Sequence, residues 1–309
     1  MKLFQSKNGQ LTPVRTIPFK TEKEIQSLVE TNVQTLFGLE FVQTELTVTD
    51  FRLDTLCFDP ETKSFVIIEY KKGKSWSVID QGYTYLSLLL NNKSDFVLEY
   101  NETKGKSLKR DEIDWSQSRV IFVSPRFTEY QKHSVNFRDI PFELWEIDRY
   151  SGDTIGLTRH QSSSSESIEG TLETSDSRVG KVSREVKVYS EEYHRTSNKR
   201  RKQGLDGVWE LYENLRDRVL ELDNVEVVPR SQYIGFRRDR PFVDVIFGSN
   251  HLLIMVNLKK GELEDPRGVT EDVSEKGHWG NGDYRFRLRP GDDLDYPMTL
   301  IRQSYDKQT

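Results

Sequence analysis

Cysteine is almost absent from this 309-residue chain, which contains only Cys57. A single cysteine cannot form an internal disulfide, and this usage is typical of a protein in a reducing compartment. No run of about 18 apolar residues is present, so we expect no transmembrane helix. The opening MKLFQSKNGQ has no apolar segment of the secretory type. These absences predict a cytoplasmic protein without a membrane partner.

Several catalytic patterns are also missing. The five histidines are scattered, and no two stand four residues apart as they would in a helical zinc site. Ser124-Pro125 lacks the flanking glycines of a nucleophile elbow. The GHWGNG stretch at 277–282 does not have the spacing of a phosphate-binding loop, and tight turns explain its glycines. Cys57 lies in an apolar strand pattern, which favours a core thiol over a nucleophile.

The net charge does not decide whether this protein binds nucleic acid. The formal net charge is −5, with 31% charged and 35% hydrophobic residues. Nucleic acid responds to a local basic face rather than to the total charge. A site that holds Mg²⁺ also adds carboxylates. The length is sufficient for two domains, each with a core of its own.

The first part of the chain alternates helical and strand patterns. A helix is predicted over 21–37, where Thr21 and Glu24 resemble a capping box and Gly38 is a stop signal. A second helix is predicted over 76–90 and a third over 128–137. Strands are predicted at 41–48, 51–58, 65–71, 95–100, 119–124 and 142–150. This order predicts a mixed α/β domain over residues 1–160.

A change of composition separates this domain from the rest. Residues 161–178 are rich in serine, and 194–204 form a basic connector, so we expect a linker over 161–204 with a short strand at 186–190. A smaller α+β domain is predicted over 205–309. It has helices over 206–222 and 293–306, with strands at 225–229, 232–237, 241–247, 251–258 and 284–288.

The stretch RLDTLCFDPETKSFVIIEYK at 52–71 places polar side chains inside apolar strands. Burying a carboxylate is costly unless it is paired, hydrogen-bonded or bound to metal. With the turn centred between Glu61 and Thr62, Asp54 lies opposite Glu69. Opposed residues of an antiparallel pair have Cβ atoms about 4.5–5.5 Å apart.

Two carboxylates at that separation repel each other, and a bridging divalent cation explains the arrangement. Oxygen ligands favour Mg²⁺ or Mn²⁺ over zinc. Lys71 projects from the same face of its strand as Glu69, where it can orient a water or stabilise charge on a phosphate. An ion-pair ladder at a sheet edge would also explain this group of side chains.

Asp54 followed by Glu69-Tyr70-Lys71 resembles the motif of the PD-(D/E)XK nuclease superfamily, although Leu53 stands where that motif has proline. Two further features resemble members of this superfamily over residues 20–150. Gln81 and Tyr85 resemble the QxxxY pair of its RecB-like branch, and Glu22 resembles the first-helix glutamate of the NucS-like endonucleases. Glu24 and Glu30 are alternatives to Glu22, and a place in the core is the alternative for Tyr85.

The resemblance implies a restriction-endonuclease-like αβββαβ sheet and a Mg²⁺- or Mn²⁺-dependent DNA endonuclease of repair, restriction or defence. It implies these metal ligands: Glu22, Asp54, Glu69 and the carbonyl of Tyr70. Lys71 would position the attacking water, and Gln81 and Tyr85 would contact the phosphate or support Lys71. The alternative is a nuclease fold that no longer cuts and that binds nucleic acid or protein as a regulatory module.

The stretches YIGFRRDRPFVDVIF, NLKKGELEDPRG and GHWGNGDYRFRL resemble an uncharacterised C-terminal domain found beside such nuclease modules. Its basic residues suit nucleic acid through phosphate pairing, although a solvated face would look the same. The candidates for nucleic-acid binding are Lys199, Arg200, Arg201, Arg237, Arg238, Lys259 and Lys260, and further arginines are present at 285, 287 and 289. The sequence leaves open a homodimer and a protein partner of this domain.

Overall fold

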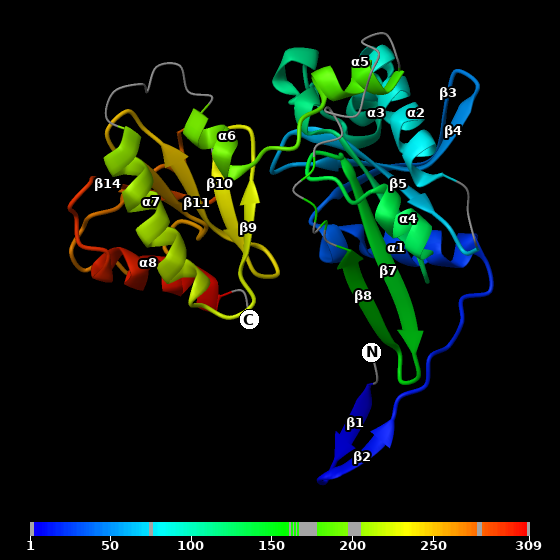
Figure 1. The fold of residues 1–309 in the computed structure, drawn as a ribbon, viewed down its shortest axis with the longest axis horizontal. Coiled ribbons are helices and arrows are strands. Elements are labelled where there is room, and N and C mark those ends of the chain that lie inside the picture. The colour runs from blue at the N-terminus through cyan, green and yellow to red at the C-terminus, as the bar shows by residue number, and fades with distance from the viewer. Residues whose placement is uncertain are drawn as a thin grey trace. The chain divides into compact units, whose positions relative to one another are not determined.

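The computed structural model of the chain describes residues 3–73, 77–160, 162, 164, 166, 178–196, 205–276 and 280–307. It divides into two compact units, Met1–Val188 and Tyr189–Thr309 (Figure 1). Within the described ranges, no helix is both long and apolar enough to cross a membrane.

The first unit is built on a six-stranded mixed sheet. Its strands, in spatial order, are β3 (Glu40–Val48), β4 (Phe51–Asp59), β5 (Ser64–Tyr70), β6 (Arg119–Ser124), β7 (Phe142–Tyr150) and β8 (Thr154–His160). β5, β6 and β7 are parallel, and the other neighbours are antiparallel. The mixed α/β architecture expected from the sequence is therefore present.

Helices cover both faces of this sheet. α1 (Glu22–Phe37) packs Ile25, Val29 and Val33 on one face, and α2 (Val78–Asn91) packs on the other. The Thr21 hydroxyl accepts the Glu24 N–H at 3.1 Å, and Gly38 ends the helix in the left-handed region. Every residue of β5 is buried because both of its sides are covered.

The strand predicted at 95–100 is wrong, because this segment belongs to α3 (Lys93–Lys104). Its β-favouring residues FVLEY suggested a strand. In the structure, Phe96 and Tyr100 lie one helical turn apart and pack against Phe65. The remaining elements of this unit are β1 (Phe4–Lys7), β2 (Gln10–Pro13), α4 (Glu129–Ser134) and two 3₁₀ turns, Arg110–Glu112 and Trp115–Gln117.

The linker predicted over 161–204 is wrong at 178–185 and 191–196, which are helical, and 197–204 lie outside the described residues. α5 (Arg178–Glu185) belongs to the first unit, where Val182 and Val186 enter the core on the α2 side. α6 (Glu191–Thr196) belongs to the second unit, and 186–190 is not a strand. Two valines four residues apart supply enough apolar area to hold a polar segment as a helix.

The second unit is an antiparallel sheet packed against two helices. Its elements are α7 (Leu205–Leu220), β9 (Glu226–Pro229), β10 (Ile234–Arg237), β11 (Pro241–Phe247), β12 (Leu252–Val256), β13 (Glu271–Asp272), β14 (Tyr284–Leu288) and α8 (Asp295–Asp306). The spatial order is β13-β14-β12-β11-β10-β9. Alternate residues such as Ile254 and Phe286 form a core with Leu215 and Ile301 of the helices.

Candidate active site

The carboxylate pair is formed by the register that the sequence predicts. β4 and β5 pair Thr55 with Ile68, and one further step places Asp54 opposite Glu69. Asp54 Oδ2 accepts the backbone N–H of Tyr70 at 3.0 Å, which holds this carboxylate against the end of β5.

Glu69 is the centre of a polar cluster on the α2 side of the sheet. Its residue is 3% exposed, and Oε1 accepts Lys71 Nζ at 2.6 Å and Gln81 Nε2 at 2.7 Å. The Gln81 amide also donates to the Tyr85 hydroxyl at 2.8 Å. Lys71 follows β5, and its backbone N–H donates to the carbonyl of Val123 at 2.9 Å, which fixes the main chain there. The strand end and α2 thus bring together four of the predicted site residues.

Burial makes two negative charges unfavourable here. It raises the pKa of Glu69, the Asp54 carboxylate raises it further, and the hydrogen bond from Lys71 opposes this rise. Burial also raises the pKa of Asp54, against the Tyr70 N–H and the charge of Lys71, while Glu22 adds to the increase. The two carboxylates therefore carry more negative charge than the bonded Lys71 ammonium balances.

A divalent cation fits this deficit. Glu69 Oε2 is buried and accepts no hydrogen bond of good geometry from the described residues, although the Tyr85 hydroxyl is close enough to lower the pKa of the Glu69 carboxyl. Two carboxylates offer the hard oxygen ligands that Mg²⁺ and Mn²⁺ prefer. The described part of the chain gathers no group of three or more His, Cys, Asp or Glu around one point, so Asp54 and Glu69 remain a pair.

The other two predicted ligands lie beside this pair. Glu22 begins α1, and its Oε1 accepts the backbone N–H of Lys72 at 2.9 Å just past the end of β5. The side chain of Tyr70 lies on the α1 side, where burial raises its pKa and its hydroxyl contacts Thr55 Oγ1 at 3.1 Å. Only the backbone of Tyr70 is placed near Asp54.

A second polar network supports β4 from the α1 side and was missed from the sequence. Gln26 is 5% exposed and donates its amide to the Asp54 carbonyl at 3.0 Å and to Glu30 Oε1 at 2.9 Å. Thr55 Oγ1 donates to the same Glu30 oxygen at 2.7 Å. Its only sequence signal was two polar side chains four residues apart among the buried positions of α1.

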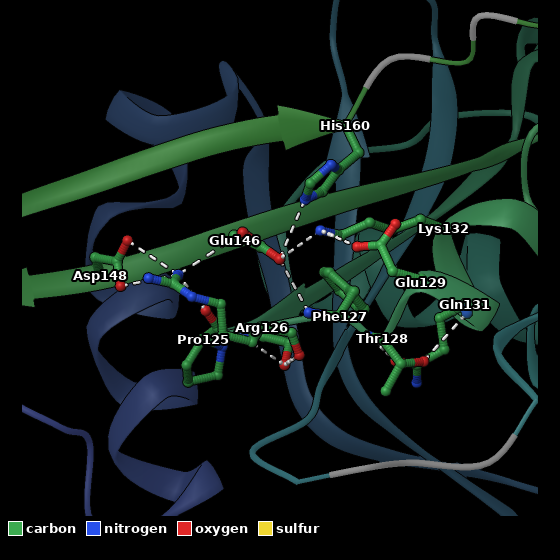
Figure 2. A network of polar contacts seen from close by, with 11 residues as sticks. Pro125, Arg126, Phe127, Thr128, Glu129, Gln131, Lys132, Glu146, Asp148 and His160 are labelled. Carbon is green, nitrogen blue, oxygen red and sulfur yellow. Dashed lines mark hydrogen bonds and ion pairs between the residues drawn. The ribbon is translucent and has the colours of Figure 1, made fainter. Parts of the chain in front are cut away.

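A third polar network lies on the α2 side of the sheet, the same face as Glu69, at Glu146 of β7 (Figure 2). Ser124 of β6 pairs with Glu146 of β7, and the backbone N–H of Lys71 bonds to Val123, the residue before Ser124. Glu146 therefore lies in the same cross-strand row as Lys71, two strands away. That separation is about 10 Å. The Glu146 carboxylate is approached by the Phe127 N–H (3.0 Å), His160 Nε2 (3.3 Å), Lys132 Nζ (3.5 Å) and Arg126 Nη1 (3.7 Å).

These donors outweigh the effect of burial on the pKa of Glu146. Burial alone would raise the pKa of Glu146, but the Phe127 N–H, Lys132 and His160 together lower it below its usual value. Arg126 also pairs with Asp148 at 3.0 Å. The Glu146 network is a charge-balanced structural cluster, with its carboxylate satisfied from several elements.

The predicted nucleic-acid residues of the second unit share one end of its sheet. Arg237 ends β10 opposite Pro241, and the chain that leads to Lys259 and Lys260 is bonded beside Phe242. Acidic groups accompany them, as in the 3.3 Å pair of Lys260 with Asp272. Arg238 lies over the Tyr305 ring. Lys199, Arg200 and Arg201 lie outside the described residues, and nucleic-acid binding by all seven stays a prediction.

Comparison with known proteins finds a full-length relative and a domain match. An uncharacterised protein of Haemophilus influenzae is 43% identical over 305 residues, which cover 98% of this chain and 99% of that protein. Residues 198–308 match the family described as "Domain of unknown function (DUF5655)".

Three solved structures are distantly similar, each with a TM-score of 0.23. A repair endonuclease from Pyrococcus abyssi is 18% identical, over 38% of this chain and 44% of that one. An EndoMS-dsDNA2 complex is 18% identical, over 37% and 40%. SfsA of Pyrococcus furiosus in complex with Ca²⁺ is 14% identical, over 44% and 61%.

The shared length and identity with the Haemophilus influenzae protein show that this chain belongs to the same family as that protein.

Proposed function

We propose that the first unit is a metal-dependent nuclease that hydrolyses phosphodiester bonds of DNA. The observation that carries this proposal is the opposed Asp54–Glu69 pair, both with raised pKa and with one buried oxygen left unpartnered among the described residues. Perturbed carboxylates of this kind are retained at a cost in stability, and they are concentrated at functional sites. With Lys71 they stand in the order of the PD-(D/E)XK motif, and Gln81 and Tyr85 follow in the place of the QxxxY pair of the RecB-like branch.

Mg²⁺ or Mn²⁺ would be held by Asp54, Glu69 and the Tyr70 carbonyl, with Glu22 close to the same strand end. When bound, such an ion lowers the pKa of a coordinated water and neutralises charge on the phosphate.

Lys71 and α2 supply the remaining functions. The Lys71 side chain is 19% exposed, so its ammonium is accessible to a phosphate oxygen or to an attacking water. It carries the positive charge that a pentavalent phosphate would need beside Glu69. Gln81 fixes Glu69 and Tyr85 in one hydrogen-bonded chain, which orients the carboxylate before substrate arrives.

One observation favours a second candidate, a nucleic-acid- or protein-binding module that does not cut. Glu69 Oε1 already accepts both Lys71 and Gln81, and the described residues supply no third carboxylate ligand to the pair. A self-satisfied cluster of this kind would not need a metal. The two candidates differ in whether the protein responds to Mg²⁺ or Mn²⁺ at all.

The test is cleavage of labelled single-stranded, duplex, mismatched and branched DNA by the full chain with Mg²⁺, Mn²⁺ or EDTA. Asp54→Ala should abolish metal-dependent cleavage and Lys71→Ala should reduce it by about 10³-fold, while circular dichroism stays unchanged in both. Glu129→Ala removes a glutamate with an 80% exposed side chain and serves as the control. Failure of the wild-type protein to cut any substrate with either metal would rule out the nuclease.

A further inference from the structure

Three arginines follow one another on one face of β14 and its continuation. Phe286 and Leu288 enter the core beneath α7 and α8, so the alternate residues Arg285 and Arg287 project from the opposite face. Arg289 continues the alternation just after the strand. We call Arg285, Arg287 and Arg289 the arginine ladder. Alternate residues of an extended strand are about 6.8 Å apart, which is comparable with the spacing of neighbouring phosphates along a single strand of nucleic acid.

The arginine ladder lines a groove of about 320 Å³ on the second unit. Leu253 of β12 and Val269 also line it, and Val269 is 47% exposed. Arginine side chains beside exposed apolar surface offer contacts for phosphates and for the flat faces of bases.

The three arginines are not equivalent. Nε and Nη2 of Arg285 both lie 2.9 Å from Glu271 Oε2, and Arg285 followed by Lys276 lowers the pKa of Glu271 to about 2. Arg285 is therefore already paired. The guanidinium groups of Arg287 and Arg289 form no ion pair with any residue in the described ranges, and both side chains belong to exposed residues.

The second carboxylate that lines the groove, Asp292, accepts a backbone hydrogen bond. Asp292 Oδ2 accepts the backbone N–H of Arg289 at 2.7 Å, and so stabilises the turn after β14 instead of pairing with the ladder. Two guanidinium groups thus remain available to an anion, each with a fork of donors that suits phosphate.

The edge of the sheet leaves these two groups accessible. β13 pairs with β14 only at Tyr284 and Arg285. No described strand pairs with the outer edge of β14 beside Arg287. A ligand can reach Arg287 and Arg289 there without displacing a strand.

We propose that this groove binds the backbone of single-stranded nucleic acid, with neighbouring phosphates on Arg287 and Arg289 and a base or sugar against Leu253 and Val269. The anion site follows from the second unit alone. The choice of nucleic acid over an acidic peptide rests on the proposed function of the first unit. This site lies at the other end of β14 from the one near Lys259 and Lys260.

Binding can be measured without cleavage, so that failure of this site and failure of the nuclease are read separately. The full chain is titrated with a fluorescent single-stranded oligonucleotide in EDTA at several salt concentrations, and anisotropy is recorded. Arg287→Gln should weaken binding about tenfold, as expected for loss of one charge-assisted hydrogen-bonded pair. Arg287→Gln with Arg289→Gln should reduce the salt slope by about 1.4, at about 0.7 per phosphate.

Arg302→Gln on α8 is the matched control, since it removes one exposed arginine of the same unit. Binding by this variant should equal that of the wild type. The proposal is overturned if Arg302→Gln weakens binding as much as Arg287→Gln, or if the wild type does not bind. Tighter binding of duplex DNA, or equal competition by polyglutamate, would overturn the single-stranded ligand.

Discussion

Glu69 and Glu146 project from the same face of one sheet, two strands apart, and their surroundings have opposite effects. Both carboxylates are largely buried, with side chains 4% and 13% exposed, and each lies near a lysine. Burial and the neighbouring Asp54 raise the pKa of Glu69, whereas the donors around Glu146 outweigh burial and lower its pKa.

The difference comes from the neighbours rather than from the depth of burial. Around Glu146, a backbone N–H and three basic side chains from separate elements converge on one carboxylate. Around Glu69, a second carboxylate occupies the opposed position and one oxygen accepts no hydrogen bond from the described residues. A fold that balances one glutamate this fully leaves the other unbalanced, which supports a functional role for the latter.

The largest difference should appear in cleavage. Lys71→Ala removes the ammonium beside Glu69 and should reduce metal-dependent cleavage by about 10³-fold, as loss of one charge-stabilising group does in other enzymes. Glu146→Gln should leave the cleavage rate within about threefold under conditions where both proteins are folded, because Glu146 contacts no reacting group. Rates on one labelled DNA substrate test this, and equal losses in the two variants would remove the distinction.

Stability should change most at Glu146. Glu146→Ala removes the acceptor of the Phe127 N–H and one of the carboxylate partners of Lys132 and Arg126, and it should lower the free energy of unfolding by about 2–3 kcal/mol. Urea denaturation of the full chain measures this, with Glu129→Ala as the exposed control on α4. An unchanged midpoint would mean that the cluster contributes nothing to the fold.

Neutralising Asp54 of the Asp54–Glu69 pair should instead stabilise the protein. In metal-free buffer at neutral pH, Asp54→Asn removes one of two neighbouring buried charges and should raise the free energy of unfolding by about 1 kcal/mol. The amide oxygen can still accept the Tyr70 N–H. The same denaturation experiment reads this change, and a loss of 1 kcal/mol or more would identify Asp54 as a structural residue.

The smallest predicted effect is in pH dependence. The pKa of Glu146 is lower in the folded protein than its usual value of 4.5, so the unfolded chain binds the proton more readily. The stability that Glu146 contributes is therefore fully present above pH 4.5 and is lost as pH falls through the folded pKa. The difference between wild type and Glu146→Gln should therefore shrink over that window. A difference independent of pH would contradict the lowered pKa.

Local sequence rules predicted the surroundings of Glu69 but not the Glu146 network. The turn in 59–64 fixes the register of Asp54 and Glu69, alternation places Lys71 beside Glu69, and helical spacing aligns Gln81 with Tyr85. The Glu146 network depends on β6, α4 and β8 meeting at one point, and no spacing within the sequence encodes that meeting. Gln26 was missed for the same reason, because besides Glu30 it donates to Thr44 of β3 and to the Asp54 carbonyl of β4.

Errors at the level of elements had a similar cause. Residues 95–100 have β-favouring side chains, yet packing of Phe96 and Tyr100 against the sheet makes them helical. The segment 178–186 is polar, yet two valines attach it to the first core. In both cases contacts with distant residues outweigh local composition.

Thermal unfolding during titration with Mn²⁺ tests most directly whether the Asp54–Glu69 pair is a metal site. A ligand that binds only the folded state raises the melting temperature as its concentration rises above the dissociation constant. The melting temperature of the wild-type chain should rise with Mn²⁺, that of Asp54→Asn should not, and Glu146→Gln should respond as the wild type does. An unchanged melting temperature of the wild type, or an equal rise in Asp54→Asn, would contradict a metal site at this pair.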